Sequence, residues 1–173
     1  MTQPASAESA PELTPENTLM LELANGPVTI QLRPDLAPNH VDRIKELARE
    51  GFYDGLVFHR VIDGFMAQTG DPLGNGTGGS GQNLDAEFNN EPHLRGAVSM
   101  ARASDPNSAD SQFFIVLKDS QFLDNKYTVW GQVVSGMEYV DQIKKGDKAA
   151  NGSVRNPDKI ISMSIAADAQ ANN

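Results

Sequence analysis

The sequence contains no cysteine among its 173 residues, so it forms no disulfide and performs no thiol chemistry. Basic residues are also few, because 14 Lys and Arg stand against 23 Asp and Glu, which gives a net charge of −9. This balance argues against nucleic acid and against an anionic membrane surface as partners, since both attract positive charge. No apolar run approaches the ~20 residues of a membrane-spanning helix. The length suffices for one domain with a sizeable core.

The two ends of the chain differ in composition from the middle. The first residues, MTQPASAESAPELTPENT, have neither the basic nor the apolar region of a signal peptide. Their Pro, Ser, Ala and Glu content is typical of disorder. We therefore predict a disordered tail over residues 1–17, one domain over 18–166, and a short C-terminal tail over 167–173, in a cytoplasmic protein.

Short β-type runs dominate the predicted domain. The alternating runs TLMLEL and GPVTIQL flank Asn25-Gly26, a dipeptide typical of hairpin turns. Further runs rich in β-branched and aromatic residues follow, bounded by Gly, Asp and Asn. Strands are predicted over residues 19–23, 28–32, 57–62, 65–69, 96–101, 112–117, 128–134 and 159–166.

Two segments have helical spacing instead. Residues 38–51 repeat apolar side chains every three to four positions and close with Gly51, whereas 135–146 opens with Ser135 and Glu138 at capping-box spacing. Eight strands with only two helices cannot form a doubly wound sheet, because no helix separates most neighbouring strands. Closing the sheet into a barrel would remove its exposed edges. We predict an all-β fold with two helices, a closed eight-stranded antiparallel β-barrel capped by two α-helices.

The glycine-rich stretch GNGTGGSG (74–81) contains G-x-G-x-x-G twice, a pattern found in dinucleotide-binding turns. Such a turn needs a strand before it and a helix after it. Here Asp71-Pro72 precedes the glycines, and NLDAEFNNEPH has no helical period. A surface loop is favoured, and nucleotide binding stays as an alternative that thermal stabilisation by nucleotides would reveal.

The three histidines share no metal-ligand spacing, so no metal site and no cofactor are predicted. His59 lies on a predicted strand with parity opposite to Arg60, and we interpret it as a core histidine bonded to the backbone. The sequence contains no G-x-S-x-G motif, the nucleophile elbow typical of many serine hydrolases.

The stretch FHRVIDGFMAQTGD (58–71) combines unlike residues. Arg60 stands between two large apolar residues on one strand face, and Gln68 follows the Phe65-Met66 pair. In SQFFIVL (111–117) the adjacent phenylalanines must point to opposite faces, one into the barrel and one outside. Burial of both faces, with a helix over the outer one, is the alternative.

Four motifs, FHRVIDGFMAQTGD, the NGTGG loop, GAVSMAR and SQFFIVL, occur in this order and spacing. Together they closely resemble the cyclophilin-type peptidyl-prolyl cis-trans isomerases, in particular the compact bacterial cytosolic branch. The likeness runs from about Thr18 to about Ala166. It implies an eight-stranded antiparallel barrel capped by two helices, with the active site on the outer face of the barrel.

The resemblance also implies roles for individual residues. Arg60 and Gln68 become the catalytic pair, and the remaining residues bind the substrate. They are Phe65, Met66, Phe114 and Leu123 in the proline pocket, Gln112 on the substrate backbone, Ala101, Arg102 and Ala103 along the peptide edge, and Phe122 and Tyr127 on the rim.

Three positions depart from the common family pattern. Many members carry tryptophan at Phe122, histidine at Tyr127 and asparagine at Arg102. The resemblance therefore implies weak binding of cyclosporin. The implied partners are proline-containing peptides and unfolded or partly folded proteins, and the expected state is a monomer.

The implied reaction suits these residues. Rotation about an X-Pro bond breaks no σ-bond, so neither nucleophile nor metal is needed. In the twisted transition state the prolyl nitrogen regains a lone pair, to which an arginine donates a hydrogen bond. A proline-binding or chaperone module with slow or absent turnover is the alternative, and Arg60 discriminates, because binding proline needs only the apolar patch.

Overall fold

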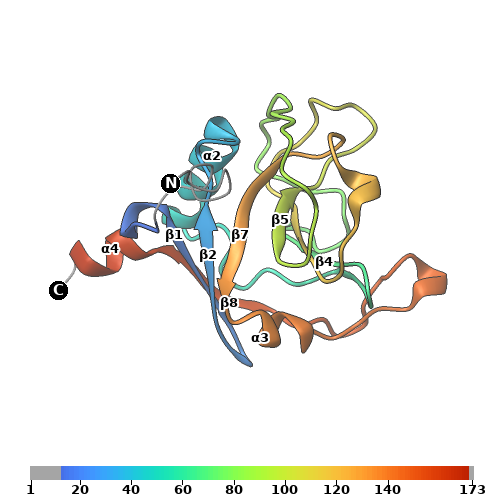
Figure 1. Ribbon diagram of the computed structural model, residues 1–173. Coiled ribbons are helices and arrows are strands. Elements are labelled where there is room, and N and C mark those ends of the chain that lie inside the picture. The colour runs from blue at the N-terminus through green and yellow to red at the C-terminus, as the bar shows by residue number, and fades with distance from the viewer. Residues whose placement is uncertain (1–12, 172–173) are drawn as a thin grey trace, which may run out of the picture.

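The structure is a computed structural model that describes residues 13–171, in which β-strands predominate (Figure 1). The strands are β1 (Thr18–Leu23), β2 (Gly26–Leu32), β3 (Arg60–Ile62), β4 (Met66–Thr69), β5 (Ala97–Met100), β6 (Phe113–Val116), β7 (Val129–Ser135) and β8 (Ile160–Ile165). The helices are α2 (Pro38–Arg49), α3 (Met137–Asp141) and α4 (Ala166–Ala171), with 3-10 turns η1 (Pro15–Asn17), η2 (Gln121–Leu123) and η3 (Lys148–Ala150). Among residues 13–171, no helix is long and apolar enough to cross a membrane.

All eight strands belong to one antiparallel sheet in the order β3-β4-β6-β5-β7-β2-β1-β8. The hairpin predicted at Asn25-Gly26 is confirmed, with Leu23 opposite Gly26. The eight antiparallel strands predicted from the sequence are therefore present, each close to its expected position.

The sheet curls into a half-barrel, and the predicted closure is not confirmed. Strands β3 and β8 are its two edges, and they share no ladder. Near this seam lie two single bridges, one from Val57 to Lys159 and one from Arg60 to Ser153. The predicted strand 57–62 is shorter than expected because only Arg60–Ile62 pairs continuously, with β4.

Helix α2 forms where helical periodicity predicted it. Pro38 occupies its first turn, where a missing N–H costs nothing. Its buried face, with Val41, Ile44 and Leu47, joins the main core, and the chain leaves the helix at Gly51 with φ +74. In Figure 1, α2 and α3 lie at opposite ends of the sheet.

The predicted helix over 135–146 is wrong in its start and length. Ser135 is the last residue of β7, where it pairs with Thr29, so it cannot cap a helix. The N-cap is Gly136, whose φ of 87 and close approach to Pro27 O admit only glycine. Helix α3 ends at Asp141, and the capping box is absent.

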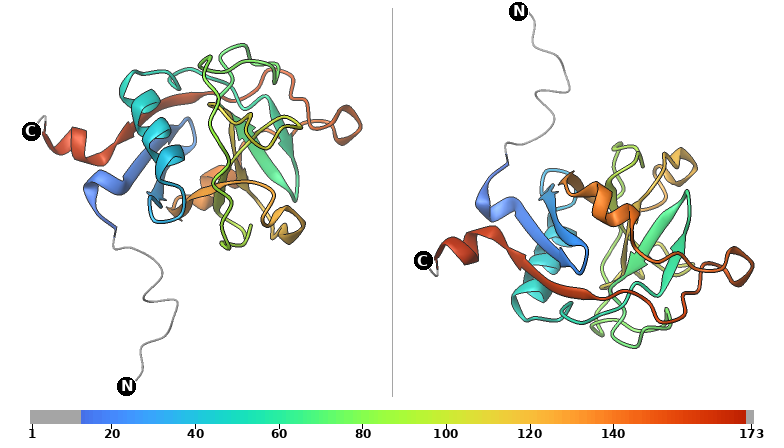
Figure 2. Two further views of the ribbon diagram at one scale, coloured as in Figure 1. Left: turned by 90° about the horizontal axis from the view of Figure 1, so that it is seen from above. Right: turned by 90° about the horizontal axis from the view of Figure 1, so that it is seen from below.

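The structure has three α-helices, not two, and the third lies at the C-terminal end. Helix α4 continues from β8 where a short tail was predicted, and η1 forms within the predicted N-terminal tail. Glu16 of η1 and Asp168 of α4 both contact Arg49 of α2, at 3.2 and 2.9 Å. Residues 1–12 of the predicted tail lie outside the described residues. Figure 2 shows η1 and α4 together on the side opposite the 147–155 loop.

Candidate active site

The sheet carries two separate apolar clusters, one on each face. Phe113 packs in the main core against Trp130, with ring centroids 5.4 Å apart. Phe114 belongs to the second cluster, which holds no residue of an α-helix; its buried members are Met66, Ala97, Phe114, Val116 and Leu123. The prediction that the two phenylalanines face opposite ways is confirmed, and burial of the outer one under an α-helix is excluded.

A pocket of about 170 Å³ opens over this second cluster. Nine of the predicted site residues line it, namely Arg60, Phe65, Met66, Gln68, Ala101, Arg102, Phe114, Leu123 and Tyr127. They come from β3, the β3–β4 turn, β4, β6, η2 and the segments after β5 and η2. We call this the proline pocket, after the role that the resemblance implies, and its apolar floor includes the buried side chains of Met66 and Phe114.

Three predicted residues lie outside this pocket. Gln112 and Ala103 line a neighbouring hollow of about 430 Å³ beside the glycine loop. Phe122 is 65% exposed and lines neither space, but its ring lies 5.5 Å from that of Phe65. It therefore forms an outer rim against which a larger ligand could pack.

Arg60 is held on two sides by neutral groups. Its Nη1 donates to Gln68 Oε1 at 3.1 Å, while Nε and Nη2 donate to Asn151 O and Oδ1 at 3.0 and 3.1 Å. A guanidinium has five N–H donors, so two stay available. Gln68 stands directly opposite Arg60 in the β3–β4 ladder, which explains their contact.

The amide chain continues from Gln68 toward the glycine loop. Gln68 Nε2 donates to Gln112 Oε1 at 2.9 Å, and Gln112 Nε2 donates to Gly78 O at 2.9 Å. Each amide orients the next, so Arg60, Gln68 and Gln112 form one rigid polar line along the pocket edge.

The charge of Arg60 is not neutralised by the protein. Among the described residues, no carboxylate forms an ion pair with it. Burial lowers its pKa from the ordinary value, but arginine stays protonated at any pH at which proteins fold. The pocket therefore presents a full positive charge against an apolar floor.

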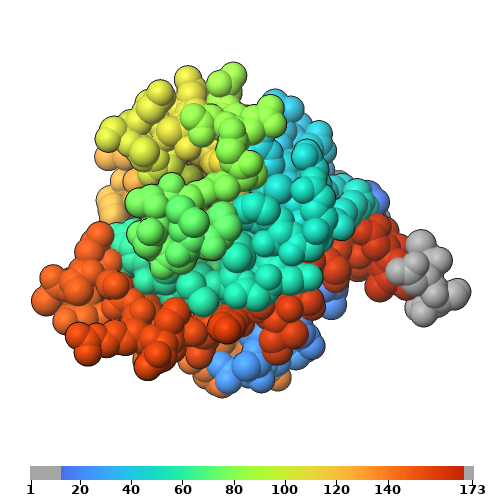
Figure 3. Space-filling view, turned by 180° about the vertical axis from the view of Figure 1, so that it is seen from behind, coloured from blue at the N-terminus to red at the C-terminus, as the bar shows by residue number. Residues whose placement is uncertain are grey.

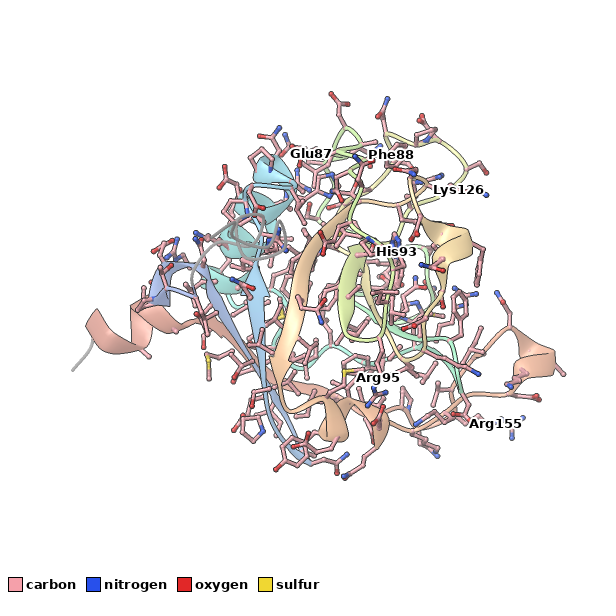
Figure 4. All side chains as sticks on the ribbon, viewed as in Figure 1. Glu87, Phe88, His93, Arg95, Lys126 and Arg155 are labelled. Atoms are coloured by element: carbon pink, nitrogen blue, oxygen red, sulfur yellow. The ribbon has the colours of Figure 1, made fainter. Side chains whose placement is uncertain are left out.

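The guanidinium of Arg102 is bound by neighbouring groups of the protein. Its guanidinium lies 4.8 Å from the ring centre of Tyr127 and 5.8 Å from that of Phe88. It also donates to Lys126 O at 2.7 and 3.0 Å. Figure 4 labels Phe88 and Lys126, which lie near one another at the same end of the molecule. The arginine thus fixes the Tyr127 wall of the pocket.

His93, to which the sequence assigned no role, supports the pocket floor from below. Its ring stacks on that of Phe114, with centroids 6.1 Å apart. Its nitrogens lie 3.0 Å from Asp124 Oδ1 and 2.9 Å from Ser99 Oγ. Burial lowers the pKa of His93, so the ring is neutral near pH 7.

The interpretation of His59 as a histidine bonded to backbone is wrong. Neither ring nitrogen has a hydrogen-bond partner within the described part of the chain, and the ring is only half-buried. It lies beside Arg60 and Gly76 instead. His59 lies immediately before β3, which begins at Arg60, and not on the strand predicted over 57–62.

The glycine loop turns its amides inward, away from any phosphate. The carboxylate of Asp71 accepts hydrogen bonds from the N–H groups of Leu73, Asn75 and Gly76 at 2.8, 2.9 and 2.5 Å. Because an internal anion occupies these donors, the geometry does not favour the nucleotide-binding alternative. No group of His, Asp and Glu suited to a metal occurs among residues 13–171.

Asn151 is a second residue at the site, after His93, that sequence reasoning missed. It lies 91 positions after Arg60, in the turn that follows η3. The dipeptide Asn151-Gly152 indicates a turn, and both residues have positive φ, 58 and 81. That signal predicts the local conformation, but nothing in it identifies Arg60 as the partner.

The fold and the site together are those of a cyclophilin-like protein. A family model described as cyclophilin type peptidyl-prolyl cis-trans isomerase/CLD matches residues 18–165. The chain therefore belongs to the cyclophilin-type peptidyl-prolyl cis-trans isomerases, and its enzyme class is that of this family.

Named relatives include bacterial proteins. A "probable peptidyl-prolyl cis-trans isomerase" of Brucella suis is 56% identical, over 94% of this chain and 89% of its own. A peptidyl-prolyl cis-trans isomerase of Synechococcus elongatus is 43% identical, over 87% of this chain and 97% of its own.

Solved structures of cyclophilins have a similar fold. A cyclophilin from Hirschia baltica superposes with a TM-score of 0.80 at 31% identity, covering 90% of this chain and 76% of that one. A Cryptosporidium parvum isomerase, solved in the presence of the dipeptide Ala-Pro, has a TM-score of 0.78 at 29% identity and covers 86% of this chain and 98% of its own.

Proposed function

We propose that the chain accelerates rotation about X-Pro bonds by non-covalent catalysis in the proline pocket, with Arg60 as the catalytic residue. The observation that carries the proposal is the position of an unneutralised guanidinium, with two spare N–H donors, at the wall of an apolar pocket.

The chemistry follows from the amide bond. Resonance creates a barrier of ~18–20 kcal/mol to rotation, and the uncatalysed exchange takes tens to hundreds of seconds. At the top of the barrier the prolyl nitrogen has a lone pair that the planar ground state lacks. A hydrogen bond from Arg60 to that lone pair stabilises the transition state selectively.

The magnitudes require more than one interaction. A hydrogen bond to a charged group contributes ~1.5–3 kcal/mol, which corresponds to about ten- to hundredfold in rate. The remainder comes from preorganisation and from an environment poor in water. Buried Met66 and Phe114 hold the ring, while Gln68 and Asn151 keep Arg60 from reorienting.

Gln68 has a second part in this mechanism. Its carbonyl oxygen is used by Arg60, and one of its two amide N–H donors is used by Gln112. The other N–H is available for a carbonyl of the substrate on either side of the rotating bond. Gln112, which immediately precedes β6, aligns that donor.

The proposed substrates are proline-containing peptides and unfolded or partly folded proteins, whose folding the chain assists as a monomer. The Ala-Pro dipeptide named with the Cryptosporidium parvum structure supports this choice. Folding assistance follows because X-Pro isomerisation is slow enough to limit folding.

A proline-binding module without turnover is the competing function, and one experiment separates the two. Proline-containing peptides are presented to the protein while cis-trans exchange is measured by a protease-coupled assay and binding by titration. The proposal expects acceleration that saturates near the measured Kd. Binding without acceleration would establish the module instead.

A further inference from the structure

A third pocket, polar and of about 450 Å³, shares only Arg60 and Gln68 with the proline pocket. It lies between the glycine loop and the turn after η3, and its walls are His59, Arg60, Gln68, Gly74, Asn75, Gly76, Ala150, Asn151 and Ser153. Figure 3 shows both flanking segments on one face, the loop in green and the 146–155 segment in orange. A peptide whose proline is held beside Arg60 therefore has this pocket within reach of a neighbouring side chain.

The walls of this pocket offer hydrogen-bond donors. Asn75 Oδ1 already accepts from Thr77, and Asn151 Oδ1 from Arg60, so each amide keeps its NH₂ group. Within residues 13–171, no bond occupies these NH₂ groups or the hydroxyl of Ser153. Donors without acceptors favour a ligand that accepts hydrogen bonds.

Two carboxylates on the segments that flank the pocket are engaged elsewhere. Asp71 is 1% exposed, and hydrogen bonds from the loop hold its pKa below the ordinary value against the opposing effect of burial. Asp147 caps η3 by accepting from Ala149 N. His59, whose pKa is lowered by burial, adds no charge near pH 7. No carboxylate lines the pocket itself.

The segment beside the pocket is basic in an acidic protein. Residues 144–159 contain five Lys and Arg against two Asp, a local charge of +3 in a chain of −9. The ammonium groups of Lys144 and Lys145 are bound to backbone carbonyls. Lys148 and Arg155 have no partner in the described part of the chain, and Figure 4 shows Arg155 pointing away from the sheet.

We propose that this pocket is a substrate subsite for an acidic side chain located within a few residues of the proline. Arg60 in the pocket wall supplies the direct attraction, and Lys148 and Arg155 on the adjoining segment add positive potential, while Asn75, Asn151 and Ser153 supply the hydrogen bonds. The inference rests on the proposed function, because the proline pocket positions the peptide.

The test uses pairs of X-Pro peptides that differ only in whether one side chain ends in a carboxylate or in an amide. Asp or Glu is compared with Asn or Gln at each of about three positions on both sides of the proline, and kcat/KM is measured for each pair. At one position we expect the acidic peptide to be favoured about three- to tenfold at low ionic strength, and less at high salt. Equal values at every position would overturn the inference.

Charge reversal identifies the residues responsible. The double variant Lys148→Glu/Arg155→Glu should reduce the acid-to-amide ratio to about one or below, whereas Lys118→Glu, at an exposed position outside the pocket, should keep it. The ratio is insensitive to a loss common to both peptides. A preference that survives the double variant contradicts the proposed subsite.

Failure of the subsite and failure of the proposed function are distinguishable. Turnover of the neutral peptides without an acid preference rejects only the subsite. Absence of turnover for every peptide rejects the isomerase proposal and the subsite with it. Ser153→Ala provides a milder variant, in which the acid preference should fall without any change of charge.

Discussion

Asn151 binds the guanidinium of Arg60 with two oxygen atoms at once, its backbone carbonyl at 3.0 Å and its Oδ1 at 3.1 Å. The left-handed conformation of Asn151, at φ 58, turns both oxygens to the same side. A residue in the turn after η3 thereby orients Arg60 of β3, the residue that we propose as catalytic.

Removing this amide should slow the reaction without altering the fold. Asn151→Gly keeps the left-handed conformation at no steric cost and loses one hydrogen bond to a charged group. We expect kcat to fall about three- to tenfold with KM nearly unchanged, because the side chain acts through Arg60. The matched control is Asn156→Gly, which replaces another asparagine of positive φ whose side chain binds nothing among the described residues.

Replacing Arg60 should lower kcat/KM more than replacing Asn151, the residue that orients it. Arg60→Ala should lower kcat/KM at least tenfold while peptide binding stays measurable, since the guanidinium acts mainly on the twisted state. Arg60→Lys should not restore the rate, because an ammonium cannot bind Gln68 and Asn151 in the same planar arrangement. Lost binding with an intact kcat would make Arg60 a binding residue.

Stability should fall in mild acid because of three histidines, of which His40 and His93 are buried and His59 is half-buried. Burial lowers the pKa of His40, His59 and His93 below the ordinary value, which is about 6.5 in the unfolded chain. The unfolded state therefore binds more protons below that pH, so the free energy of unfolding is constant above about pH 7 and decreases toward pH 5. Melting temperatures across this range test the sign. A Tm that is constant or rises toward pH 5 would contradict it.

Inhibition by cyclosporin should be weak and should improve with Phe122→Trp. The exposed phenyl ring lacks the N–H and part of the area of an indole. A lost neutral hydrogen bond of ~0.5–1.5 kcal/mol and ~1 kcal/mol of contact predict roughly ten- to hundredfold weaker binding. Inhibition of turnover measures the change, and kcat/KM should stay within a few-fold. Unchanged inhibition would mean that Phe122 does not contact the ligand.

Two truncations of the N-terminus should distinguish the contribution of residues 1–12 to stability from that of η1. Deleting residues 1–12 should leave Tm and activity nearly unchanged, as their composition predicts. Deleting through Glu16 removes its contacts with Lys45 and Arg49, and the Tm should drop by about 1–4 °C at low salt and less at high salt. Activity should persist in both, because η1 lies far from the 147–155 loop (Figure 2). An activity loss would connect η1 to the site.

The sequence by itself determined the local elements and most of the pocket. Asn25-Gly26 specified a hairpin, apolar spacing specified α2, and strand parity placed Phe113 and Phe114 on opposite faces. These predictions succeeded because each depends on the period of side-chain directions within one short segment. Family motifs then named nine residues that do line the proline pocket.

Only the tertiary structure decided which segments meet. The pairing of β7 with β2 turned Ser135 from a helix cap into a strand end, and the short β3 left the half-barrel without a continuous seam. The turn after η3 brought Asn151 to Arg60, and stacking on Tyr127 occupied Arg102. A local pattern specifies the conformation of its own segment but not its partner, because partners distant in sequence are selected by the packing of the whole sheet.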